Sequence, residues 1–272
     1  MKKNQTIGFL VALLFFAISA AAQNNSPEQL VVSLSNPGKP YSLSIRLTFG
    51  SIKVIGYAGK EIVIEAASAD KSKTTNAEDG GNGMKRIFPP GGYDITATEN
   101  NNSVTIGSSH NKHVSLVIKI PQDVKLKLAT VNDGAIEVDN VKGELEVNNV
   151  NGAIKLTNIS GAAVASTVNG NVTAGFISIS NTPMAFSTLN GNVDVSFPAD
   201  AKANLKLKSD RGEIYTDFDM AIDQAEQKSI KTSESGMQRI KVDDWIKGRI
   251  NGGGAEMLMK NMNGNIYVRK IK

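Results

Sequence analysis

The sequence predicts an all-β protein built as a β-solenoid with about 18–21 residues per coil. Three observations support this fold class. Glycines recur at a spacing of nine residues, apolar and polar residues alternate between them, and the apolar content is mostly Val, Ile, Leu and Ala with few aromatic residues. Such a composition is typical of many short strands joined by tight turns.

The glycine period is clearest in "TVNDGAIEVDNVKGELEVNNVNGAIKLTNISGAAVASTVNGNVTAGF", where Gly134, Gly143, Gly152, Gly161 and Gly170 follow one another without a break. Asn or Asp often comes just before the glycine. Both residue types tolerate the positive φ that tight turns require. A helix would be weakened by a glycine at this spacing. The glycines therefore mark turns between strands.

Apolar residues stand two, four and seven positions after these glycines, and the residues at three and five are mostly polar. The apolar positions are Ile136, Leu145, Ile154, Ala163 and Val172 at two; Val138, Val147, Leu156, Ala165 and Ala174 at four; and Val141, Val150, Ile159, Val168 and Ile177 at seven. Alternation with a period of two indicates a strand with one buried face. A meander of hairpins with Asn-Gly turns is an alternative. The seventh position favours a coil, because a two-residue hairpin loop needs no inward residue there.

The spacing then lengthens, since Gly191 and Gly212 each follow 21 residues after the preceding matching glycine. Two units of nine make a coil of two strands, and we interpret the longer spacing as a coil that lacks its second glycine. The motif also occurs early, at Gly50 and Gly59, and returns near the end at Gly264. All ten glycines are predicted to be structural turn residues.

The rest of the chain supplies further strands and two exceptions. Residues 23–48 and 93–129 contain alternating runs, and the pattern of residues 117–138 is echoed by residues 195–215. Residues 66–92 show no sustained period and are predicted to form a long loop. Residues 217–250 interrupt the repeat, and within them residues 238–242 favour a strand over a helix.

The first 22 residues are predicted to be a Sec signal peptide. Lys2 and Lys3 precede a short apolar run, and small residues follow it. The domain then spans residues 23–272 and is exported to the periplasm, the outer surface or the medium. It has no cysteine for disulfides or lipid attachment. Without the two leader lysines, 28 basic groups face 26 acidic groups, a balance that argues against nucleic acid as a partner. No second apolar stretch is long enough to cross a bilayer.

Several stretches together resemble the DUF4097 family of adhesin-like proteins. They are "LTFGSIKVIGYAGKEIVIEA", "VIKIPQDVKLKLATVNDGAIEV", the run of N-G-x-[IV] strands and "INGGGAEMLMKNMNGNIYVRK", and the resemblance covers most of residues 30–272. It implies a single-stranded, right-handed β-solenoid in a secreted or envelope protein. The family has no agreed catalytic residues, so the resemblance implies none in this chain.

No set of residues in the sequence predicts catalysis, a cofactor or a metal site. On a strand, His110 and His113 would lie on opposite faces and could not share a metal ion. The acidic residues considered for calcium are Asp133, Asp139, Asp194, Asp217 and Asp219. The chain lacks the G-G-x-G-x-D repeat of calcium-binding β-rolls, which favours a solvated role for them.

Three residues are candidates for ligand contact. Asp217 and Asp219 flank Phe218 and would share one strand face, while Trp245, the single tryptophan, could stack on a sugar or pack over the end of the core. A further set is predicted to form hydrogen-bonded stacks along the coil corners: Asn148, Asn149, Asn151, Asn158, Asn169 and Asn171.

The sequence thus favours an exported, non-enzymatic scaffold that binds a glycan or another envelope component. One alternative is a structural or regulatory envelope protein that contacts protein partners. The other is a β-helix polysaccharide lyase or hydrolase, which would need paired carboxylates in a groove.

Overall fold

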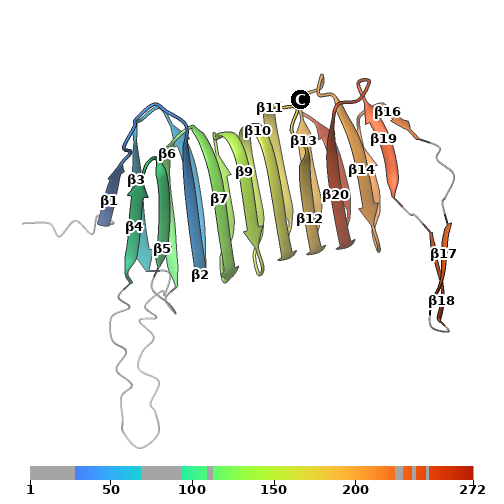
Figure 1. Ribbon diagram of the computed structural model, residues 1–272, viewed down its shortest axis with the longest axis horizontal. Helices are drawn as coiled ribbons and strands as arrows, with labels where there is room; N and C mark the ends of the chain where they lie inside the picture. Colours follow the sequence, from blue (N-terminus) through green and yellow to red (C-terminus); the bar gives the residue numbers. More distant parts are fainter. Residues whose placement is uncertain are drawn as a thin grey trace, which may run out of the picture.

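The computed structural model describes residues 28–68, 93–108, 113–223, 229–234, 237–242 and 245–271, which form strands and turns without a helix (Figure 1). The all-β class is therefore confirmed for these residues. None of them forms a helix that is long and apolar enough to cross a membrane. The predicted leader, His110 and most of the predicted loop at 66–92 lie outside the described residues.

The strands form two layers that enclose the apolar core. The first layer has the order β1 (Glu28–Ser33), β3 (Glu61–Ser68), β6 (Val114–Pro121), the second half of β2 (Tyr41–Tyr57), β8 (Ile136–Asp139), the first half of β10 (Ile154–Asn169), β11 (Val172–Ile179), β13 (Val193–Phe197), β21 (Ile266–Lys270) and β15 (Ile214–Thr216).

The second layer has the order β4 (Ile95–Asn100), β5 (Ser103–Ser108), the first half of β2, β7 (Asp123–Asn132), β9 (Lys142–Asn149), the second half of β10, β12 (Met184–Asn190), β20 (Ala255–Asn263), β14 (Ala203–Ser209), β19 (Ile246–Ile250) and β16 (Met220–Ile222). A separate antiparallel pair consists of β17 (Ser229–Glu234) and β18 (Met237–Val242).

Successive coils stack in parallel with the predicted period. Ile154 pairs with Ile136 and Ser160 pairs with Lys142, a displacement of 18 residues in both layers. Val193 pairs with Val172, so the coil of 21 residues is also present. The handedness of the coils stays a prediction.

The order of coils in space differs from their order in the sequence at two places (Figure 1). Strand β2 lies between the β5–β6 and β7–β8 strands, and β20–β21 lie between β12–β13 and β14–β15. The two echoed segments, residues 117–138 and 195–215, are the segments that pass around these inserted strands. The sequence had suggested that Gly191 and Gly212 lie on neighbouring coils. They do not, because Gly264 lies between them.

A column of corner glycines explains every second glycine of the strict period. A Cβ on Gly134 would lie 2.0 Å from the carbonyl oxygen of Gly50, and one on Gly152 would lie 2.0 Å from that of Gly134. The column continues through Gly170, Gly191, Gly264 and Gly212. Each α-carbon packs against the backbone of the next coil, so no side chain fits there.

Gly50 begins this column, and Gly143 and Gly161 repeat the close packing at the opposite corner, where a Cβ on Gly161 would lie 2.2 Å from the Gly143 carbonyl oxygen. Gly50, Gly143 and Gly161 lie inside strands, where positive φ values of 121°, 129° and 126° bend a continuous strand around a corner. Gly59 is a turn residue between β2 and β3, but it packs against the ring of Tyr57 and not against another coil. Its resemblance to the repeat was misleading, because β3 pairs antiparallel with its neighbours β1 and β6.

The prediction for the seventh position is correct at only one of the two corners. Val141 and Ile159 are buried at one corner, and Val150 and Val168 are exposed at the other. Ile177 belongs to the first corner but is exposed, because the register shifts there and the buried Phe176 pairs with Ile159 instead. A unit of nine residues is half a coil, so consecutive units end at different corners. At the corner of the glycine column a polar residue occupies the inward place.

That inward place holds a second column, of buried or partly buried polar side chains. Each donates a hydrogen bond to a corner glycine carbonyl of the adjacent coil. The donors and acceptors are Thr130 with Gly50, Asn149 with Gly134, Thr167 with Gly152, Thr188 with Gly170, Asn261 with Gly191 and Ser209 with Gly264, at 2.8–3.1 Å. These bonds satisfy backbone acceptors at the bend, where a buried unpaired carbonyl would be costly.

Two segment predictions also need correction. Ala66 is buried within β3, which reaches Ser68, so the predicted loop starts later than residue 66. The segment 217–250 is not irregular throughout, since it contributes β16, β17, β18 and β19. The strand predicted at residues 238–242 is confirmed as part of β18.

Candidate functional site

Two tyrosines form an aromatic surface where the first layer ends. Tyr215 on β15 pairs in register with Tyr267 on β21, and Tyr267 pairs with Asp194 on β13. The tyrosine rings are stacked, with centroids 5.3 Å apart and planes 9° from parallel. Tyr215 is 46% exposed. Among the described residues β15 pairs only with β21, so the second face of the Tyr215 ring borders the open edge of the layer.

Charged and polar groups hold the two rings in place. The Arg269 guanidinium lies 4.7 Å from the centroid of the Tyr267 ring, and its Nε donates to Asp194 Oδ1 at 2.8 Å. This hydrogen bond to the carboxylate raises the pKa of Arg269. The hydroxyl of Tyr215 donates to Glu213, which raises the pKa of Tyr215. The surface thus combines an exposed ring with fixed donors and acceptors.

The rings border a shallow hollow of about 190 Å³. Its walls are Tyr215, Thr216, Asp217, Tyr267, Val268 and Arg269. We call these six residues the tyrosine platform. An aromatic face beside a few polar groups is the usual composition of a small-ligand site.

The structure separates the predicted contact residues Asp217 and Asp219. They lie in the bend between β15 and β16, not on one strand, because the chain crosses there from the first layer to the second around the buried Phe218. Asp217 joins the platform, and its Oδ1 accepts a hydrogen bond from the backbone N–H of Lys270 at 2.7 Å. Asp219 is exposed and does not line the platform.

Trp245 lies apart from the platform. Trp245 precedes Ile246, the first residue of β19. Asp219 lies near the opposite end of β19, because it precedes Met220, which pairs with Ile250. The Nζ atoms of Lys206 and Lys208 lie 4.9 and 6.0 Å from the Trp245 ring centroid. The ring is half-buried beneath these lysines, which leaves less of its face for a sugar than the sequence had suggested.

The remaining candidates have structural partners. His113 stacks on Phe49 with centroids 5.0 Å apart, and its Nδ1 lies 3.7 Å from Asp133 Oδ2. Asp139 Oδ1 accepts a hydrogen bond from Asn158 at 3.0 Å. In the part of the chain that the structure describes, no three histidine or acidic residues gather as a metal site would require.

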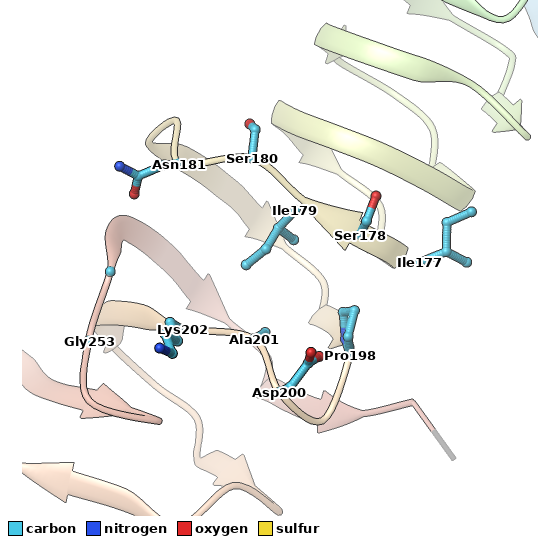
Figure 2. Close-up of a pocket in the computed structure, with 11 residues that line it drawn as sticks. Ile177, Ser178, Ile179, Ser180, Asn181, Pro198, Asp200, Ala201, Lys202 and Gly253 are labelled. Carbon is cyan, nitrogen blue, oxygen red and sulfur yellow. The ribbon is translucent and has the colours of Figure 1, made fainter.

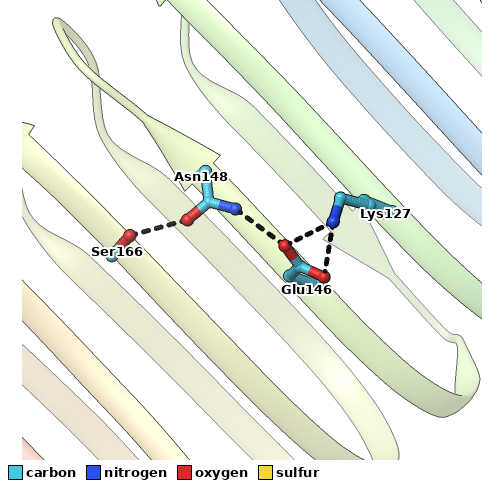
Figure 3. A network of polar contacts seen from close by, with 4 residues as sticks. All are labelled: Lys127, Glu146, Asn148 and Ser166. Carbon is cyan, nitrogen blue, oxygen red and sulfur yellow. Dashed lines mark hydrogen bonds and ion pairs between the residues drawn. The ribbon is translucent and has the colours of Figure 1, made fainter.

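The predicted asparagine stacks are present in part, since Asn149 donates to the Gly134 carbonyl and Asn158 donates to Asp139. Asn169 donates to Asn151 at 2.8 Å, and the backbone N–H of Asn192 donates to Asn171 Oδ1. Figure 3 shows a different row on the outer face of the second layer, in which Ser166 donates to Asn148 and Lys127 contacts Glu146. The hydrogen bond from Lys127 lowers the pKa of Glu146.

A larger hollow of about 490 Å³ lies near the opposite corner (Figure 2). Residues Ile177 to Asn181 form one side, and Pro198, Asp200, Ala201 and Lys202 face them. Its walls contain no aromatic ring. The hollow lies where residues 198–202 pass around the inserted β20, and we attribute it to that crossing.

Sequence reasoning missed the tyrosine pair, although a signal was present. Tyr215 and Tyr267 each stand three residues after a column glycine, Gly212 and Gly264. Equivalent positions on neighbouring coils stack, so two aromatic residues at this position predict a stacked pair. The signal was hidden because 52 residues separate the two tyrosines in the sequence.

The described residues thus form an all-β protein of stacked coils with a hollow beside two stacked tyrosines. The model of the family described as Toastrack DUF4097 matches residues 124–244. The match covers less than half of the chain, and the resemblance seen in the sequence is confirmed over this segment.

Two solved structures are similar at low identity. A "putative cell adhesion protein" from Clostridium sporogenes shares 11% identity with a TM-score of 0.39, over 90% of this chain and 100% of that one. A "putative adhesin" from Bacteroides fragilis shares 8% identity with a TM-score of 0.29, over 91% of this chain and 98% of that one. No curated protein matches the chain.

Proposed function

We propose that this chain is an exported, non-enzymatic, adhesin-like protein that binds a glycan of the cell envelope at the tyrosine platform. Its stacked coils form the right-handed, single-stranded β-solenoid that the sequence predicts. The observation that carries the proposal is the Tyr215–Tyr267 stack, because an exposed aromatic face can pack against the apolar face of a sugar ring. Arg269 and Asp194 can then bond to sugar hydroxyls around the rings.

The non-enzymatic reading has support from the carboxylates around the platform. Hydrolysis of a glycosidic bond requires one carboxyl group as an acid and a second as a base or nucleophile. Asp194 is bound to Arg269, Glu213 accepts from Tyr215, and Asp217 accepts from the backbone of Lys270. Each is engaged in holding the structure, which favours binding over bond cleavage.

A protein partner is the second candidate, and the edge of β15 favours it. An unpaired strand edge presents backbone donors and acceptors that another chain can extend. The edge strand spans three residues, Ile214–Thr216, which limits the backbone contacts available. For this reason we place glycan binding first.

The test is retention of the purified protein on a polysaccharide panel and on envelope fractions of the source organism, with sugar release measured in parallel. We expect retention without release. Tyr215→Ala should weaken retention by about 30-fold, the ratio for the loss of roughly 2 kcal/mol from one aromatic anchor. Tyr215→Phe should retain binding, because it keeps the ring.

Trp245→Ala is the matched control, since it removes an aromatic ring outside the platform. Equal losses for Trp245→Ala and Tyr215→Ala would contradict the assignment of the platform. Release of reducing or unsaturated ends would overturn the non-enzymatic proposal. Crosslinking to one specific protein, with no retention on any sugar, would favour the second candidate.

A further inference from the structure

An exposed apolar column runs along the corner of the glycine column. Its members are Val131, Val150, Val168 and Leu189, which are 41%, 36%, 37% and 43% exposed. Hydrogen bonds from Asn151 N to Val131 O and from Asn169 N to Val150 O place these residues on neighbouring coils. Single exposed apolar residues are ordinary, but a row on adjacent strands is a feature that marks binding surfaces.

An asparagine ladder lies beside this apolar column. Side-chain amides donate from Asn151 to Asn132, from Asn169 to Asn151, from Asn190 to Asn169 and from Asn263 to Asn190, at 2.7–3.0 Å. A side-chain amide has two N–H donors and an oxygen with two lone pairs. Each inner asparagine uses one N–H and one lone pair for the hydrogen bonds within the ladder. The second donor and the second lone pair remain for a ligand at this exposed corner.

The two columns together form a long uncharged strip, which we call the corner track: Val131, Val150, Val168, Leu189, Asn132, Asn151, Asn169, Asn190 and Asn263. The outward residues beside it on the second layer are also uncharged on three coils, at Asn148, Ser166 and Ser187. The row becomes basic on the last coil, where Lys260 pairs with Ser187 and Arg211 donates to Asn263 at 3.4 Å. A polyanion would require a basic surface along the whole track, which the coils from Asn132 to Asn190 do not provide. Sugar hydroxyls, in contrast, both donate and accept hydrogen bonds, and sugar rings carry apolar C–H faces.

The corner track leads into the tyrosine platform. Asn265 follows the Asn263–Gly264 pair, and its side chain donates to the Tyr267 hydroxyl at 3.0 Å. Strands in a sheet are spaced by about 4.8 Å, so the five coils from Asn132 to Asn263 span about 19 Å. A ligand on the platform can therefore continue along the track only if it is an extended polymer.

We propose that the corner track and the platform together bind an extended, uncharged polysaccharide that lies along the stacking axis. This inference rests on the proposed glycan binding and adds the class and the direction of the ligand. One sugar packs against the tyrosines, and the following sugars lie over the valines with their hydroxyls on the asparagine amides. Affinity then depends on chain length, which a site confined to the platform would not produce.

The test is titration calorimetry of the full protein with cello-oligosaccharides and N-acetylated chito-oligosaccharides, from disaccharide to octasaccharide. For at least one series we expect affinity to rise by about tenfold or more between trisaccharide and hexasaccharide. Val168→Glu should remove this rise and lower hexasaccharide affinity by about tenfold, with a smaller loss for the trisaccharide, which reaches fewer coils of the track. Val164→Glu is the matched control, because Val164 lies on the same strand and is 43% exposed, but points from the outer face of the second layer.

The outcomes separate this inference from the proposed function. Binding that is lost in Tyr215→Ala but does not vary with chain length would overturn the track and keep the platform. Equal effects of Val168→Glu and Val164→Glu would also overturn the track. Binding of acidic polysaccharides alone, or of neither series, would overturn it as well. Thermal unfolding of each variant, with Val168→Thr as a conservative partner, shows whether a loss arises from misfolding.

Discussion

The α-carbon of Gly152 packs so closely on Gly134 that a Cβ at Gly152 would lie 2.0 Å from the Gly134 carbonyl oxygen. The φ of Gly152 is not in the left-handed region, so the requirement for glycine here is the space between coils and not backbone conformation. The neighbouring coil is held by its own hydrogen bonds and cannot retreat at one point alone.

Gly152→Ala should therefore destabilise the protein by about 3 kcal/mol or more, at the upper end of the cost of overpacking. Chemical denaturation followed by circular dichroism measures the effect. Gly175→Ala is the control, because the nearest atom to a Cβ there is the Leu156 carbonyl oxygen at 3.9 Å. Similar losses in the two variants would contradict the steric explanation of the glycine column.

Thr167→Val should lower the free energy of unfolding by about 1–3 kcal/mol, the cost of leaving a buried acceptor without its donor. Thr167 is 6% exposed and donates to the Gly152 carbonyl at 2.8 Å. Valine has nearly the same shape, so the change isolates the hydrogen bond. Thr173→Val on the exposed side of β11 should change the stability by less than about 0.5 kcal/mol. A neutral Thr167→Val would show that water replaces the threonine.

Tyr41→Phe should destabilise the inserted strand β2, because the Tyr41 hydroxyl donates to the Pro121 carbonyl at 2.7 Å where the chain passes around it. We expect a loss of about 1 kcal/mol or more, since Tyr41 is buried. Tyr57→Phe should cost less, because its bond to the Glu61 carbonyl is exposed and water can replace the hydroxyl. The opposite ranking in denaturant melts would argue against this role of Tyr41.

The same tyrosine predicts alkaline sensitivity. Burial, with smaller contributions from Tyr57 and Asp123, raises the pKa of Tyr41 in the folded protein. The unfolded chain then ionises first, so the contribution of Tyr41 is complete below about pH 10 and declines as the pH rises above it. The free energy of unfolding, measured across this pH range, should fall less steeply in Tyr41→Phe than in the wild type. Identical slopes would contradict the assignment.

Glu99 on β4 predicts sensitivity to acid. Hydrogen bonds from the backbone and the hydroxyl of Ser35, and then from the backbone of Asn102, lower the pKa of Glu99 below 4.5. Because the folded value is depressed, the stabilisation is present above the unfolded pKa and is lost as the pH falls through the folded one. Glu99→Gln should melt at a lower temperature than the wild type near neutral pH, and the two should converge in acid. A difference that persists in acid would point to packing instead.

The sequence by itself determined the coil and its inward face. A glycine every nine residues, with apolar residues two and four positions later, specifies a strand, a bend and a buried row, and residues such as Ile136 and Val138 are buried as this pattern predicts. These are local properties, because backbone conformation and side-chain alternation act over a few residues. The same pattern at Gly59 was misleading, since a local signal does not reveal the direction of the neighbouring strand.

Only the tertiary structure decided which coils are neighbours. Backbone hydrogen bonds between strands are the same for any pair of sequences. No local sequence signal therefore predicts that β2 pairs with β7, or that β20 and β21 pair with β14 and β15. The tyrosine platform depends on that choice, because Asp194, Tyr267 and Tyr215 come from three coils that are adjacent in space but not in sequence. Long-range packing, and not any local motif, brings them together.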